Sequence, residues 1–136
     1  MSIEIRVIND SIHKRLPSNS AKEVIQRVFA GENVESASVT VVYLDSDKMA
    51  KLNLDFLQHE GPTDVITFPL EEEQIDGEIY ICPDVAKEQA VEYKCTFKDE
   101  LLRLTAHGAL HLCGYDDDTE EKRNKMHILE TKYIYV

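Results

Sequence analysis

The sequence predicts one domain in which a single sheet of about four strands is covered by helices. Segments with the two-residue period of strands alternate along the chain with segments that have the helical period. A length of 136 residues suits one compact domain. No internal repeat, low-complexity tract or flexible linker divides it. We therefore expect residues 1–136 to fold as one domain around one core.

The first expected strand carries apolar residues at alternate positions, Ile3, Ile5 and Val7. Ser20-Ala21-Lys22-Glu23 has the pattern of a capping box and predicts the start of a helix. Gly31 is the expected end of that helix, since glycine is the commonest residue just after a helix. The chain therefore begins with a strand followed by a helix.

The same order repeats in the next segment. The β-branched run 37–44 predicts a second strand, and Asp45-Ser46-Asp47 offers an N-cap for a helix whose apolar residues continue to Leu57. Two further strands are expected at 64–69 and 77–82, where apolar and β-branched residues again dominate. Because little chain separates these two strands, we expect them to form a hairpin.

Helices are expected to fill the remainder of the chain. Pro83 is typical of a first helical turn and predicts a helix from about 83 to 94. A second, largely apolar helix is expected over 98–113 and ends at Gly114. Asp118 or Thr119 can cap a last helix that runs to about 132.

The most informative segment lies at the end of the apolar helix. His107 and His111 are four residues apart, so both imidazoles lie on one helix face and can bind one cation, as in the zinc helix of zincins. A turn at Gly114 can bring a residue ten after the first histidine back to the same site. That residue is Asp117, and the three side chains leave one coordination position for water.

Chance explains this combination poorly. In a chain of this composition, two histidines, a glycine and an acid at these three spacings are expected on the order of 0.001 times. The alternative that both histidines are hydrogen-bonded core residues stays open. Gly108 stands where a zincin peptidase has its general-base glutamate, so the pattern disfavours peptide hydrolysis. A water bound to the cation can instead attack a phosphodiester, which favours RNA as substrate.

At these residues the chain resembles the YbeY family of metal-dependent endoribonucleases, whose motif runs His-Gly-x-Leu-His-Leu-x-Gly-Tyr-Asp-His. Further blocks occur in the family's order: Leu52-Asn53, Phe56, Pro62-Thr63-Asp64-Val65-Ile66-Thr67-Phe68-Pro69, Gly77-Glu78-Ile79, Met126 and Glu130. The resemblance thus extends over most of the chain.

This resemblance implies an α+β fold with a single mixed sheet and a zincin-like metal helix. It implies one Zn²⁺ per chain, with Mn²⁺ or another divalent cation as the alternative. It also implies an endonuclease for single-stranded RNA that acts in ribosomal RNA maturation and ribosome biogenesis. The expected partners are therefore ribosomal RNA and ribosomal particles.

The chain departs from the family pattern at two positions. Asp117 takes the place of the third histidine ligand, and a carboxylate oxygen is an acceptable zinc ligand. Asp116 and Asp118 are rival ligands. Leu57 stands where the family has an arginine, a natural clamp for phosphate. The expected substrate-binding replacements for that arginine are Arg103, Arg123 and Lys125.

The formal net charge of −11 disfavours nonspecific association with nucleic acid through the whole surface. Two alternatives therefore stay open: a ribosome-associated binding module with weakened catalysis, and a metallohydrolase of another substrate class. The sequence shows neither the basic and apolar regions of a secretory signal nor an apolar run of about 20 residues. We expect a cytoplasmic protein with no membrane partner.

Overall fold

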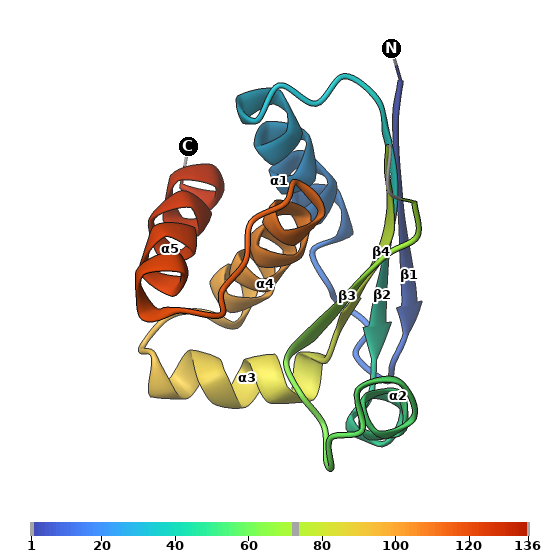
Figure 1. Cartoon of the computed structure of the whole chain (residues 1–136). Helices are drawn as coiled ribbons and strands as arrows, with labels where there is room; N and C mark the ends of the chain where they lie inside the picture. Colours follow the sequence, from blue (N-terminus) through green and yellow to red (C-terminus); the bar gives the residue numbers. More distant parts are fainter. Residues whose placement is uncertain (1, 72–73, 136) are drawn as a thin grey trace.

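The computed structural model describes residues 2–71 and 74–135, which form an α+β fold (Figure 1). Four strands and five helices occur in this part of the chain. Their order is β1 (Ile3–Asp10), α1 (Ser18–Gly31), β2 (Ala37–Leu44), α2 (Ser46–Leu57), β3 (Val65–Pro69), β4 (Ile75–Ile81), α3 (Pro83–Glu92), α4 (Phe97–Leu112) and α5 (Glu120–Ile134). None of these helices is long and apolar enough to cross a bilayer.

The strands form one mixed sheet in the order β1-β2-β4-β3. β1, β2 and β4 are parallel, and β3 runs antiparallel to β4 at the edge of the sheet. The expected hairpin is therefore confirmed, with Val65 opposite Ile81 and Pro69 opposite Gly77. This arrangement leaves one side of β3 without a partner strand.

Helices α1, α4 and α5 lie on one side of the sheet, and α2 lies near the C-terminal ends of β1 and β2 (Figure 1). The main core joins α1 and α4 to the inward side chains of β2 and β4. A smaller cluster packs α2 against the sheet through Leu44, Met49, Ile66 and Cys82. Helix α4 contacts α1, α3, α5, β3 and β4, which explains why its sequence is apolar on most faces.

The turn after α4 and the cap of α5 follow the predicted chemistry, and α4 has an N-cap that was not predicted. The Thr96 hydroxyl accepts a hydrogen bond from the Asp99 N–H at the start of α4. Gly114 has a φ of 100°, the left-handed conformation that glycine adopts at low cost, and it turns the chain back after α4. Thr119 caps α5 by accepting from the Lys122 N–H. The loop between the two helices is therefore fixed at both of its ends.

Two expected caps are wrong in detail. Helix α1 begins at Ser18 with Pro17 as its N-cap, so Ser20 lies inside the helix and does not form a capping box. Asp45 does occupy the N-cap of α2, but its side chain makes no cap hydrogen bond there. Its Oδ1 accepts instead from the Ile12 N–H at 3.1 Å, which ties the segment after β1 to the start of α2.

Candidate metal centre

Two imidazoles and one carboxylate converge at the C-terminal end of α4. His107 and His111 lie one helical turn apart, and their Nε2 atoms are 3.0 Å from each other. The turn at Gly114 returns the chain so that Asp117 Oδ2 lies 3.4 Å from Nε2 of His107 and 3.6 Å from Nε2 of His111. The three residues predicted from their spacing are thus brought together.

These donor atoms fit a divalent cation. Ligands at about 2.0 to 2.1 Å from a tetrahedral zinc lie about 3.3 Å from one another, which matches the three separations. Two neutral imidazoles and a carboxylate are a donor set that zinc and several other divalent ions accept. Since all three side chains are partly exposed, a fourth position remains open to solvent or substrate.

Asp117 is the acid whose carboxylate reaches both histidines. Asp116 lines the same pocket, whereas Asp118 forms an ion pair with Lys122 at 3.1 Å. The side chain of Asp117 is 43% exposed, so its position depends on the short loop between α4 and α5. The geometry therefore favours Asp117 over its two neighbours.

A buried carboxylate on α5 orients the first histidine. Glu130 is 1% exposed, and its Oε2 lies 2.8 Å from Nδ1 of His107. Because a carboxylate can only accept, Nδ1 of His107 carries the proton and Nε2 keeps its lone pair for a cation. Carboxylates that hold metal-binding histidines in this way fix both the tautomer and the ring orientation.

The same carboxylate belongs to a buried network of charges. Arg103 donates to Glu130 Oε1 at 3.1 Å, and it forms two hydrogen bonds with Glu100, at 2.7 and 2.9 Å. Burial by itself would lower the pKa of Arg103, but the bonds and charges of these two glutamates outweigh it and hold the pKa above its ordinary value. Arg103 therefore serves first to neutralise two buried acids.

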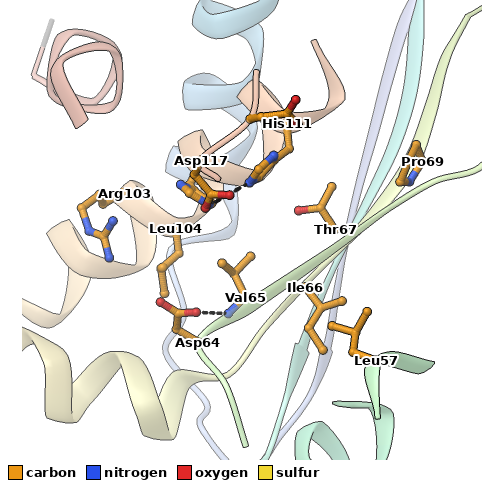
Figure 2. A pocket seen from close by; sticks show the side chains of 12 residues that line it. Leu57, Asp64, Val65, Ile66, Thr67, Pro69, Arg103, Leu104, His111 and Asp117 are labelled. Atoms are coloured by element: carbon orange, nitrogen blue, oxygen red, sulfur yellow. Dashed lines mark hydrogen bonds and ion pairs between the residues drawn. The ribbon is translucent and has the colours of Figure 1, made fainter. Parts of the chain in front are cut away.

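The candidate centre opens into a pocket of about 460 Å³ between α4 and β3 (Figure 2). The lining residues are Leu57, Asp64, Val65, Ile66, Thr67, Pro69, Arg103, Leu104, His107, His111, Asp116 and Asp117. Leu57 thus contributes an apolar side chain to the wall. Three acids and one paired arginine leave the lining short of free positive charge.

The three basic residues predicted to bind substrate take different places. Arg103 lines the pocket, but two glutamates hold its guanidinium. Arg123 donates to the backbone oxygen of Asp117 at 3.2 Å, and Lys125 lies 5.6 Å from the centre of the Tyr115 ring. Neither of the latter two is among the lining residues of this pocket.

Packing explains why glycine occupies position 108. A Cβ atom on Gly108 would lie 2.6 Å from Cγ2 of Ile79, so α4 approaches β4 too closely there for any side chain. A glutamate at this position would point into the sheet rather than into the pocket. The structure thus supports the argument against a zincin peptidase mechanism.

Glu130 and Thr67 are site residues to which the sequence reasoning assigned no role. A signal for Glu130 exists in the sequence: Met126, Glu130 and Tyr133 have the spacing of one helix face, and all three are buried. An acid within an apolar stripe requires a buried partner. Thr67 has no comparable signal, because a threonine in a strand is ordinary.

The α+β fold and the three convergent donors are typical of metal-dependent hydrolases. A family model described as Endoribonuclease YbeY matches residues 3–135. A relative from Thermotoga maritima with that name is 39% identical over 131 residues, which cover 96% of this chain and 86% of the relative. A relative from Chlorobaculum tepidum with the same name is 43% identical over 114 residues, 83% of each chain.

A solved structure gives the same result. The solution structure of TM1509 from Thermotoga maritima matches with a TM-score of 0.72 at 36% identity, over 96% of this chain and 86% of that one. The chain therefore belongs to the YbeY family, which confirms the resemblance found in its motifs and the α+β fold that the resemblance implied.

Proposed function

We propose that this protein is a metal-dependent endoribonuclease that cuts single-stranded RNA during ribosomal RNA maturation. Family membership supports the activity, since the curated relatives are named endoribonucleases. The observation that carries the site assignment is the convergence of His107, His111 and Asp117 within 3.0 to 3.6 Å. In this proposal residues 1–136 act as one domain.

The proposed cation is Zn²⁺, with Mn²⁺ as the alternative because one ligand is an oxygen. When bound, it supplies a Lewis acid for phosphodiester hydrolysis. His107 and His111 hold it from one helix face, and Asp117 closes the third position. Glu130 keeps the proton on Nδ1 of His107, so that this ring binds only through Nε2.

Around this centre, the pocket walls orient the RNA. Arg103 presents the only cationic side chain among the lining residues, and Arg123 and Lys125 follow on the first turns of α5. We assign these three residues to contacts with phosphates. Arg103 would contact a phosphate inside the pocket, and Arg123 and Lys125 would contact phosphates of the neighbouring nucleotides outside it. Phosphate contacts position the substrate without reading its sequence.

A cleavage assay tests the function. Single-stranded ribosomal RNA fragments are incubated with the protein as purified, with excess chelator, and with Zn²⁺ or Mn²⁺ added back. Cleavage is expected to stop with chelator, to return with metal and to be absent in His111→Ala. Cleavage that persists with chelator or in His111→Ala would overturn the proposal.

The second candidate is a ribosome-associated binding module with weakened catalysis. Leu57 in the wall and the acidic lining favour it, because both weaken the hold on a phosphate. In the same assay this candidate predicts binding of the RNA fragments without metal-dependent cleavage. A gel-shift measurement run beside the cleavage assay separates the two functions.

A further inference from the structure

The unpaired side of β3 faces the pocket with a fixed pattern of backbone groups. Just before and just after the strand, Cys82 N–H donates to the Asp64 oxygen at 2.9 Å and Leu70 N–H donates to the Asp76 oxygen at 2.7 Å. In an antiparallel pair, hydrogen-bonded positions alternate with positions whose backbone groups point away from the partner. The backbone groups of the even-numbered residues of β3 therefore bond to β4. The backbone groups of Val65, Thr67 and Pro69 point to the open edge.

Only one N–H on this edge is free for a ligand. The Val65 N–H is taken by Oδ1 of Asp64 at 2.7 Å, and Pro69 has no N–H. Within β3, all of whose residues the structure describes, Thr67 therefore offers the one backbone donor on the open edge. Its side chain extends into the same space as His111 and Asp117, and all three residues line the pocket (Figure 2).

The charges that line the pocket explain why a neutral hydrogen-bond donor would help to bind a phosphate there. A phosphodiester carries negative charge that grows on its nonbridging oxygens during hydrolysis, and fixed donors aimed at that charge lower the barrier. The lining acids repel it, and the Arg103 guanidinium is already bonded to two carboxylates. Leu57 adds no donor. Neutral N–H and O–H groups on the pocket wall would therefore supplement Arg103 in holding a nonbridging oxygen of the phosphate.

We propose that Thr67 binds a nonbridging oxygen of the scissile phosphate through its backbone N–H and its hydroxyl. This inference rests on the proposed endoribonuclease function and assigns one wall of its pocket. The edge of β3 thus supplies hydrogen-bond donors to a pocket wall in which Leu57 supplies none. Because a backbone donor is fixed by the sheet, it needs no reorganisation when the charge develops.

The test compares Thr67→Val with Thr67→Ser. Valine keeps the branched shape of threonine and its strand propensity but lacks the hydroxyl, whereas serine keeps the hydroxyl. We expect kcat for cleavage of a single-stranded RNA to fall about 100-fold in Thr67→Val and to recover most of that loss in Thr67→Ser. Affinity for Zn²⁺ and thermal stability are expected to remain those of the wild type in both variants.

A sulfur-substituted substrate makes the test specific to one oxygen. Sulfur accepts hydrogen bonds poorly, so the diastereomer with sulfur at the oxygen bound by Thr67 is expected to react slowly with the wild type. In Thr67→Val, sulfur at that position is expected to slow cleavage less, relative to the oxygen substrate, than it does in the wild type. For the other diastereomer, the ratio of sulfur to oxygen rates is expected to be the same in both proteins. Thr40→Val on β2, outside the pocket, is the matched control and behaves as the wild type in both measurements.

The outcomes separate this inference from the function on which it rests. If the wild type does not cut RNA with metal, the proposed function fails. If the wild type cuts RNA and Thr67→Val shows the wild-type kcat and the wild-type sulfur effect, the inference fails alone. A fall in activity that Thr67→Ser shares, with weaker Zn²⁺ affinity, would also overturn it by showing a structural role.

Discussion

Glu130 is a buried acid whose two oxygens serve two different partners. One oxygen accepts from Arg103 and the other accepts from His107, so the carboxylate joins the charge network of α4 to the candidate metal centre. Glu100 is equally buried and also bonds to Arg103, but among the described residues no hydrogen bond or ion pair joins it to His107. The chain thus supplies its own control for the effect of removing a buried carboxylate.

Glu130→Gln is expected to weaken Zn²⁺ affinity about tenfold, because the amide holds the Nδ1 proton of His107 less strongly than a carboxylate does. Competition with a coloured chelator measures this affinity. Glu100→Gln is expected to lower thermal stability about as much as Glu130→Gln does, but to leave the Zn²⁺ affinity unchanged. Equal affinities in Glu130→Gln and Glu100→Gln would show that Glu130 has only a structural role.

Asp117 sets the charge of the proposed centre. A cation held by two neutral imidazoles and one carboxylate has less net positive charge than one held by three imidazoles, and it is the weaker Lewis acid. Asp117→His is therefore expected to bind zinc more tightly and to shift the pH–rate profile of RNA cleavage toward lower pH. Asp117→Ala weakens metal binding. If Asp116→Ala abolishes binding and Asp117→Ala does not, the third ligand has been assigned to the wrong carboxylate.

Helix α4 can present its two histidines only because it packs closely on β4. Gly108→Ala would improve helix propensity by about 1 kcal/mol, but the new methyl group meets Ile79 at 2.6 Å. Overpacking of this kind costs about 1 to 3 kcal/mol, so we expect a net loss of about 1 kcal/mol in the free energy of unfolding. Urea denaturation measures it. In the background of Ile79→Ala the same substitution is expected to stabilise, and an unchanged effect there would contradict the packing argument.

A second group of contacts fixes the starts of α2 and α3. His13 Nε2 lies 2.8 Å from Asp84 Oδ1, and Asp84 Oδ2 accepts from the Ser46 N–H at 2.9 Å. The hydrogen bond from His13, followed by the bonds from Ser46, outweighs burial and holds the pKa of Asp84 below its ordinary value of 3.8. The segment after β1 is thereby tied to two helices.

Because the pKa of Asp84 is lowered on folding, its contribution to stability is present above the unfolded pKa and is lost as the pH falls below about 3.8. Asp84→Asn is expected to be less stable than the wild type at pH 7, and the difference is expected to shrink toward pH 3. Urea denaturation at both pH values gives the comparison. Asp10→Asn, which removes only the exposed ion pair with Lys48, is expected to change little. A difference for Asp84→Asn that stays constant with pH would contradict the assignment.

Local chemistry explains which helices and strands the sequence predicts well. The β-branched run 37–44 predicts β2 at its observed bounds, and Pro83 and Gly114 mark the start of α3 and the turn after α4 as expected. The start of α1 is predicted three residues late, because Pro17 rather than Ser20 occupies the N-cap and makes no side-chain cap hydrogen bond. A capping-box pattern therefore indicates a nearby helix rather than its first residue.

The residues of the candidate site also fall into two groups, those that local sequence predicts and those that depend on tertiary packing. His107, His111 and Asp117 can be predicted because one helix and one turn bring them together, and local spacing describes both. The contact between His107 and Glu130 depends on how α5 packs against α4, which no local pattern specifies. The free N–H of Thr67 depends on the register of β3 against β4, and a shift of one residue would reverse it.

The charge of the whole molecule works against its proposed substrate. A net charge of −11 repels RNA at long range, and three of the acids that contribute to this charge line the pocket. A bound cation is then the largest positive charge available at the site, and it offsets this repulsion where the phosphate must approach. The function we propose therefore requires that the three converging side chains hold a metal ion.

Native mass spectrometry of freshly purified protein tests this requirement most directly. The spectrum is predicted to show one divalent cation per chain in the wild type and in the control His59→Ala, an exposed histidine outside the site. The cation is predicted to be lost from His107→Ala and His111→Ala and to be reduced in Asp117→Ala. A wild type without a cation even after addition of Zn²⁺ or Mn²⁺, or histidine variants that keep one, would contradict the metal centre on which the function depends.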